Sequence, residues 1–497
     1  MGEFNRRRFL QGVAAATGGV LVGGPMQTLV GSAASAQRPS RFFDLGPVPD
    51  LRDGRVRLHL PRGFQYRSFH DNDGPPVVLP DGTILPGRHD GMAAFPGPGG
   101  NVWLVRNHEV NGPGDPFGPA DADPYDAMTR GGTTTVLVTP RGEVLDAFTS
   151  LNGTQMNCAG GRMPWGSWIT CEETVNGPDV GADFTGAPNT ALQRPHGFIF
   201  EVPAGGQSSR QPIRKAGRFA HEAAAFSPDE GIVYLTEDNF GFPSGLFRYI
   251  PPSNPMVTGR LEDGGTLQML RVVGQPGIDL AVQQEIGATY PVAWVDIPEP
   301  DPEFPFTPGE PAPTSNNDAI IFVGNQGRAQ GAAWFSRLEG AAFVKGEIYF
   351  VATQGGGPSE GSFGPIGNGY GNGTGQVWSY NPRTQILTVR HQAPENPNEL
   401  VDLDLPDNIT ARNNRGSIVI CEDGPTNNFI RGLTRDGELF DIALNRLTRN
   451  ADPSVTRFGE EFAGATFSPD GGTLFVNIQA SDAITFAIWG PWGRLGV

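Results

Sequence analysis

The chain has 497 residues and a net charge of −17, with 70 glycines, 46 prolines and 9% aromatic residues. So acidic a chain is a poor partner for nucleic acid or for an anionic membrane surface. Frequent Gly and Pro between recurring hydrophobic runs indicate many turns between short strands, so we expect an all-β protein.

The N-terminal segment predicts export. The stretch NRRRFLQGVAAATGGVLVGG places consecutive arginines before a short, weakly apolar run, which is typical of a twin-arginine signal. Ala34-Ser35-Ala36 offers a cleavage site, so we assign residues 1–36 to the signal and 37–497 to a single domain. A membrane anchor would need about 20 apolar residues, and this run is interrupted. We expect a periplasmic or secreted monomer that uses the twin-arginine export machinery.

Six stretches downstream repeat one hairpin pattern. Each has a short strand, a turn rich in Gly, Pro, Asp or Asn, and a second strand with polar residues at or near its end. In chain order they are 89–109, 157–173, 220–239, 337–355, 406–424 and 462–479. The intervals leave room for two more strands per hairpin, which predicts a six-bladed β-propeller.

Four of these hairpins share one spacing. A residue that opens the first strand is followed fifteen positions later by a polar residue at the end of the second. The pairs are Glu222 and Glu237, Glu339 and Gln354, Asp407 and Glu422, and, with cysteine in the acidic position, Cys158 and Glu173. The first and last hairpins fit less closely. Because the last one ends without a carboxylate, we expect it to complete the ring without contributing to a site.

A hairpin returns the chain to its starting side, so both sets of residues are expected at one mouth of the ring. The inner set is Cys158, Glu222, Glu339 and Asp407, and the outer set is Glu172, Glu173, Glu237, Asp238, Glu422 and Asp423. A single such acid is better explained as an acceptor of backbone hydrogen bonds that stabilises its blade. So many carboxylates together would repel one another, which favours bound cations for the set as a whole.

The ligand types suggest two kinds of metal. Calcium prefers oxygen, whereas iron and zinc accept a thiolate, so the inner set with Cys158 suits a transition metal and the outer acids suit calcium. Zinc usually brings histidines; His108 and His221 lie beside acids, but the inner set itself contains no histidine. Iron is therefore preferred over zinc.

Metal ions held by carboxylates suit the hydrolysis of a phosphate ester. Arg337 lies two residues before Glu339, on the same face of an extended strand, where it could contact the phosphate. A structural salt bridge to one of the acids is the alternative. Cys171 aligns with Thr236 and Cys421 at equivalent strand ends, so we interpret it as a packing residue.

With these motifs, the chain resembles the PhoX family of secreted alkaline phosphatases. The matching stretches are HDGMAAF, VRNHE, NCAGG, PWGSWITCEE, GRFAHEAA, YLTED, FSRLEG, ICEDG and FSPDGGTLFVNIQ, in this order over most of residues 60–480. The resemblance implies a six-bladed propeller whose active site combines iron with calcium. It implies that Cys158, Glu222, Glu339 and Asp407 bind iron, that the acids of TCEE, TED and CEDG bind calcium, and that Arg337 contacts phosphate.

Three functions follow as hypotheses. The first is an extracytoplasmic alkaline phosphatase that acts on small phosphate monoesters with iron and calcium. The second is a calcium-dependent lactonase or phosphotriesterase, and the third is a non-catalytic binding propeller that calcium stabilises.

Overall fold

The structure is a computed structural model that describes residues 44–357, 372–412 and 416–497. The predicted export signal, residues 1–36, lies outside the described residues. Within these residues the protein is mostly β, with four short α-helices: α2 (Pro255–Thr258), α3 (Asn316–Ile320), α4 (Phe322–Arg328) and α5 (Trp492–Leu495). None of the helices in the described ranges is long and apolar enough to cross a bilayer.

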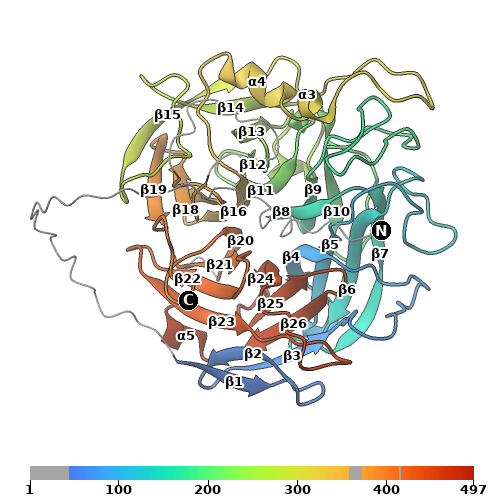
Figure 1. Ribbon diagram of the computed structural model, residues 1–497, viewed down its shortest axis with the longest axis vertical. Coiled ribbons are helices and arrows are strands. Elements are labelled where there is room, and N and C mark those ends of the chain that lie inside the picture. The colour runs from blue at the N-terminus through green and yellow to red at the C-terminus, as the bar shows by residue number, and fades with distance from the viewer. Residues whose placement is uncertain (1–43, 358–371, 413–415) are drawn as a thin grey trace, which may run out of the picture.

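Six strands line the middle of the molecule. They are β4 (His89–Pro96), β8 (Asn157–Met163), β11 (His221–Ser227), β16 (Leu338–Val344), β20 (Pro406–Ala411) and β24 (Glu461–Phe467). Neighbours in this order contact one another, and β24 contacts β4, so these inner strands form a closed ring. Figure 1 shows their labels encircling the centre of the view.

Each inner strand pairs antiparallel with a second strand, which confirms all six predicted hairpins. The second strands are β5 (Val102–His108), β9 (Ser167–Glu172), β12 (Ile232–Glu237), β17 (Glu347–Ala352), β21 (Ile418–Glu422) and β25 (Thr473–Gln479). We call each hairpin with its outer strands a hairpin unit, and we call the end of the ring where the inner strands begin the mouth.

The outer strands extend each sheet away from the ring. They are β6 (Gly131–Val138), β7 (Val144–Thr154), β10 (Ile199–Pro203), β13 (Leu246–Ile250), β14 (Thr266–Val272), β18 (Gln376–Asn381), β19 (Ile386–Gln392), β22 (Phe429–Leu433), β23 (Leu439–Asn445) and β26 (Ile484–Trp489). One further strand, β15 (Thr289–Asp296), pairs with both β14 and β19 and so joins two units into a nine-stranded sheet.

The N-terminal strands complete the last two units. Strand β3 (Gln65–Phe69) pairs with β26, next to the C-terminus. Strand β2 (Val56–Pro61) pairs with β23, and β1 (Leu45–Pro49) pairs with β2. Segments from opposite ends of the sequence therefore share sheets, which ties the ring closed.

Small residues let the inner strands of neighbouring units approach closely. A Cβ atom on Gly161 would lie 1.8 Å from the carbonyl oxygen of Ala224 in the next inner strand. At Gly340 it would lie 2.6 Å from the carbonyl oxygen of Asp407. Real Cβ atoms do not tolerate such distances, so glycine at these positions is required for the ring to be this narrow.

Candidate metal centre at the mouth

The predicted inner ligands lie in β-bulges that recur at the same place in their inner strands. In every unit the pairing between the inner strand and its neighbour shifts register, in five units directly after the first residue of the inner strand and in the last unit nearer its middle. Cys158, Glu222, Glu339 and Asp407 are the first residues inside four of these irregularities. Because a bulge removes a residue from the regular ladder and redirects its side chain, the four side chains can converge at the mouth.

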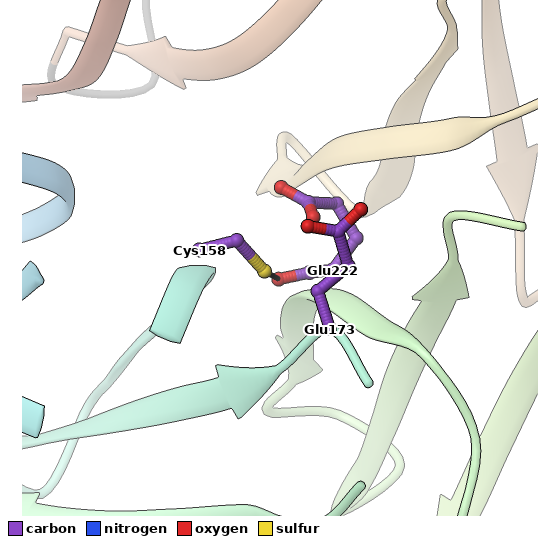
Figure 2. Close-up of side chains that lie close together, drawn as sticks. All are labelled: Cys158, Glu173 and Glu222. Carbon is purple, nitrogen blue, oxygen red and sulfur yellow. Dashed lines mark hydrogen bonds between the residues drawn. The ribbon is translucent and has the colours of Figure 1, made fainter. Parts of the chain in front are cut away.

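The structure brings these side chains together in two overlapping clusters. Ligand atoms of Cys158, Glu173 and Glu222 all lie within 4.8 Å of one another, as do those of Glu222, Glu339 and Asp407. Figure 2 shows the carboxylates of Glu173 and Glu222 side by side, with the sulfur of Cys158 beside them. Glu222 belongs to both clusters, so the two could hold neighbouring cations that share its carboxylate.

The electrostatics of the clusters favour a cation. Burial and then the charge of Glu339 raise the pKa values of Glu222 and Asp407 well above their usual range. Burial and the charge of Glu222 raise the pKa of the Cys158 thiol in the same way. Among the described residues, Oε2 of Glu222 has no hydrogen-bond partner. A bound cation would remove both the repulsion and the unsatisfied oxygen, so these residues fit a metal.

The glutamates that end the second strands have a different environment. Asn157 pairs with Glu172, His221 with Glu237, and Pro406 with Glu422, so these three glutamates are structural equivalents. The fifteen-residue spacing had aligned Glu173 with Glu237 and Glu422, and this alignment is wrong by one residue. The second hairpin is shorter, so a fixed count from Cys158 passes the end of its strand.

Glu172 is fully saturated by donors. Its Oε1 accepts hydrogen bonds from the backbone N–H of Gln155 at 2.9 Å and from Nδ1 of His196 at 2.6 Å. Its Oε2 accepts from the backbone N–H groups of Gly197 and Phe198 at 2.9 and 3.1 Å. Although burial opposes the charge of His196, the neighbouring carboxylates raise its pKa to about 9. Glu172 therefore fixes the segment that leads into β10.

Glu237 and Glu422 likewise fix the segments that lead into the third strands of their own units. Glu237 accepts a hydrogen bond from the N–H of Gly245, just before β13, and Glu422 accepts from the N–H of Phe429, which begins β22. Glu422 also accepts from Nε of Arg431 at 2.9 Å. Burial raises the pKa of Glu237 to about 7 and that of Glu422 to about 8. In the described residues, none of the three strand-end glutamates belongs to either ligand cluster.

The other predicted outer acids follow these glutamates directly and lie at the mouth. The N–H groups of Glu173, Asp238 and Asp423 donate to the carbonyl oxygens of Met156, Ala220 and Leu405, which immediately precede the inner strands. Glu173 joins the first cluster. Asp238 adds to the charge around Glu222, and Asp423 adds to the charge around Glu461, the first residue of β24.

Three acids at the mouth were absent from the predicted set, namely Asp90, Glu109 and Glu461. Asp90 is buried and raises the pKa values of Glu222, Asp407 and Glu461. Gln479 donates to Asp90 at 3.2 Å and also to Glu109. The expectation that the last hairpin contributes nothing is therefore wrong, because Glu461 and Gln479 both belong to it.

A sequence signal for Asp90 was available. The run His89-Asp90-Gly91 resembles His221-Glu222-Ala223, but the first hairpin carries a 3₁₀ turn at Pro98–Gly100 that lengthens it. The fixed count of fifteen residues from Asp90 therefore ends inside the second strand, which hid the equivalence. Alignment on the start of the inner strand would have found it.

Arg337 pairs with two acids of the mouth. Its Nη2 donates to Asp238 and Glu339, both at 2.6 Å, and its Nε donates to Asp238 at 3.1 Å. The residue is not in an extended strand, as had been expected, because it precedes β16 with φ of +45°. The salt bridge considered as the alternative to a phosphate contact is thus present, and it holds the guanidinium beside the second cluster.

Comparison with known proteins gives a family match over most of the chain. The family model described as "Alkaline phosphatase PhoX" matches residues 43–147 and 141–482. No curated protein shows a significant match.

Solved structures agree on the fold. PhoX from Pseudomonas fluorescens, solved in complex with vanadate as a transition state analogue, has a TM-score of 0.63 at 17% identity, covering 91% of this chain and 98% of that chain. A periplasmic gluconolactonase from Pseudomonas aeruginosa has a TM-score of 0.38 at 14% identity, covering 89% and 90% of the two chains, which is too low to carry an argument. The chain therefore has a mostly β, propeller-type fold.

Proposed function

The chain belongs to the alkaline phosphatase PhoX family, whose members are metal-dependent phosphomonoesterases, and we propose that its site combines iron with calcium at the mouth. Membership of this family favours the phosphatase over the lactonase and over the non-catalytic binding propeller. The observation that carries the metal proposal is the pair of clusters that share Glu222, one with a thiol and one with carboxylates alone.

The donor sets support a division of ligands. Iron is assigned to Cys158, Glu222, Glu339 and Asp407, since a thiolate among carboxylates suits a transition metal. Calcium is assigned to the mouth acids Glu173, Asp238 and Asp423, whose oxygens suit a hard cation. The saturated contacts of Glu172 support a bracing role, and its equivalents Glu237 and Glu422 are assigned the same role.

The arrangement suits phosphoryl chemistry. Cations bound here would neutralise charge on a phosphoryl group as Lewis acids. Arg337 is proposed as the phosphate contact, because its guanidinium is a charged donor suited to phosphate oxygens and already lies beside Glu339. Its two carboxylate partners hold it in place before substrate arrives, which lowers the ordering cost of binding.

The same proposal includes architecture and location. Six inner strands in a closed ring support a six-bladed propeller formed by one domain over residues 37–497. The twin-arginine pattern in residues 1–36 supports export as a folded, metal-loaded protein to the periplasm or beyond. Its proposed partners are the export machinery and a small phosphate ester, and it is proposed to act as a monomer.

Hydrolysis of 4-nitrophenyl phosphate at alkaline pH tests this function. The purified protein should release 4-nitrophenol, a calcium chelator should abolish the release, and calcium but not magnesium should restore it. Release that persists unchanged in chelator would overturn the calcium part of the proposal. Absence of release from protein with its full metal complement would overturn phosphatase activity in this chain.

A further inference from the structure

A second arginine occupies the same structural position as Arg337. The sequence Arg-x-acid-Gly occurs at the start of two inner strands, as 88–91 and as 337–340. Arg88 and Arg337 both have left-handed backbone conformations, with φ of +50° and +45°. In each unit the first residue after the second strand donates its N–H to the arginine carbonyl, Glu109 to Arg88 at 3.0 Å and Thr353 to Arg337 at 2.9 Å. The two arginines are therefore equivalents.

The two positions lie on opposite sides of the mouth. In the ring order, two inner strands separate β4 from β16 in either direction, β8 and β11 one way and β24 and β20 the other. Figure 1 shows β4 and β16 across the centre from each other. The cluster of Glu222, Glu339 and Asp407 comes from β11, β16 and β20, on the Arg337 side. Arg88 thus faces the mouth from the side away from this cluster.

The two arginines differ in accessibility. The side chain of Arg337 is 4% exposed and is held by two carboxylates, whereas that of Arg88 is 31% exposed. Arg88 donates from Nη2 to the Glu109 carboxylate and from Nε to the Glu109 carbonyl oxygen, both at 2.6 Å. Glu109 thus orients this guanidinium from two of its atoms, and the side chain keeps a solvent-exposed part, which suits recognition of an anion.

A short network joins Arg88 to the metal-binding acids. Glu109, the partner of Arg88, accepts a hydrogen bond from Gln479, and Gln479 also donates to Asp90. Asp90 in turn acts electrostatically on Glu222 and Asp407, one of which belongs to both clusters. The Arg88 side chain is thus connected to Asp90 through the Glu109 carboxylate and the Gln479 amide.

We propose that Arg88 binds a second anionic group on the alcohol portion of the substrate, so that this enzyme prefers phosphate esters which carry a carboxylate or a further phosphate. The inference rests on the proposed function, with the phosphoryl group on the Arg337 side. An ester that reaches across the mouth then places its leaving group toward Arg88. A charge-assisted, partly desolvated contact of this kind discriminates between leaving groups with and without negative charge.

Two aryl phosphates that differ only in a carboxylate test the proposal. We would measure kcat/KM for phenyl phosphate and 4-carboxyphenyl phosphate with the wild type, Arg88→Gln and Arg260→Gln. Arg260 is a suitable control because it is also paired with one acid, Glu262, but its side chain is 69% exposed. The ratio of the two kcat/KM values should fall about tenfold, equivalent to about 1.4 kcal/mol, in Arg88→Gln, mainly through KM, and should stay unchanged in Arg260→Gln.

Other outcomes have distinct meanings. Equal losses of kcat/KM on both substrates in Arg88→Gln would show that Arg88 only positions Glu109, and unchanged kcat/KM values on both substrates would show that it has no role, so either result overturns the proposal. If Arg88→Gln does not fold, Arg88→Lys replaces it, with a smaller expected fall in the ratio because the charge is kept and the planar fork is lost.

A binding measurement separates this proposal from phosphatase activity itself. Calorimetric titration of the metal-loaded protein with phenylphosphonate and 4-phosphonobenzoate needs no turnover. Tighter binding of the carboxylate-bearing phosphonate to the wild type, lost in Arg88→Gln, would support the proposal even if the protein hydrolysed neither phosphate. Equal affinity of the wild type for both phosphonates would overturn it while leaving the proposed phosphatase function intact.

Discussion

Adjacent residues at the end of one strand have different environments at the mouth. Glu172 and Glu173 are neighbours in TCEE, but their side chains leave the chain in different directions. Glu172 turns to the donors that precede β10, and Glu173 joins Cys158 and Glu222. The sequence predicted that acids gather here, but it could not separate the two roles, because the donors to Glu172 come from residues 155 and 196–198.

Paired substitutions of these glutamates separate the roles. Glu172→Gln should lower the free energy of unfolding of the metal-free protein by about 3 kcal/mol, because an amide N–H₂ would face buried N–H donors that now meet a carboxylate. Glu173→Gln should leave the stability of the metal-free protein nearly unchanged and lower its metal content. Urea unfolding of the chelated protein checks the expected stabilities. Metal analysis of the protein before chelation checks the expected metal content. Loss of metal without loss of stability in Glu172→Gln would show that this glutamate is itself a ligand.

At the scale of the elements, the hairpins were predictable and their exact pairing was not. Alternation and turn residues located all six hairpins. The candidate inner ligands Cys158, Glu222, Glu339 and Asp407 could be predicted because each is the second residue of an inner strand. Turn lengths differ between hairpins, as the 3₁₀ turn at Pro98–Gly100 shows, so counting residues across a turn misplaced the partner positions.

The stability that the N-terminal strands β1 and β2 contribute should decrease in acid. Arg57, at the start of β2, donates to Asp50 at 2.8 Å and to both oxygens of Asp53 at 2.7 and 2.8 Å. The Arg57 hydrogen bond holds the pKa of Asp53 below its usual 3.8. A depressed carboxyl pKa stabilises the folded protein above pH 3.8 and loses this contribution as pH falls.

Asp53→Asn should therefore cost stability at neutral pH and cost progressively less in acid. Because the Asp53 side chain is 34% exposed, we expect the difference at pH 7 to be below about 1 kcal/mol. The difference between wild type and variant should narrow between pH 4 and pH 2. Unfolding midpoints measured across this range check the expectation, and a difference that widens in acid would contradict the sign of the argument.

At the scale of the whole molecule, closure of the ring creates the site. Asp90 in the first unit and Gln479 in the last unit meet at one mouth because β24 contacts β4 and β3 pairs with β26. Sequence order alone predicted a ring, yet Glu109 and Glu461 could not be placed beside the other acids until the first and last units were adjacent. The family match identifies the chain as a PhoX-family phosphomonoesterase, and we propose that its chemistry takes place at this mouth.

Elemental analysis of the exported protein tests the central claim most directly. We expect stoichiometric iron together with calcium in the wild type, loss of iron in Cys158→Ser, and retention of iron in the matched variant Cys171→Ser. Cys171 is an apt control because it is buried in the neighbouring strand and lies outside both ligand clusters of the described residues. Wild-type protein without iron, or full iron retention in Cys158→Ser, would contradict the account.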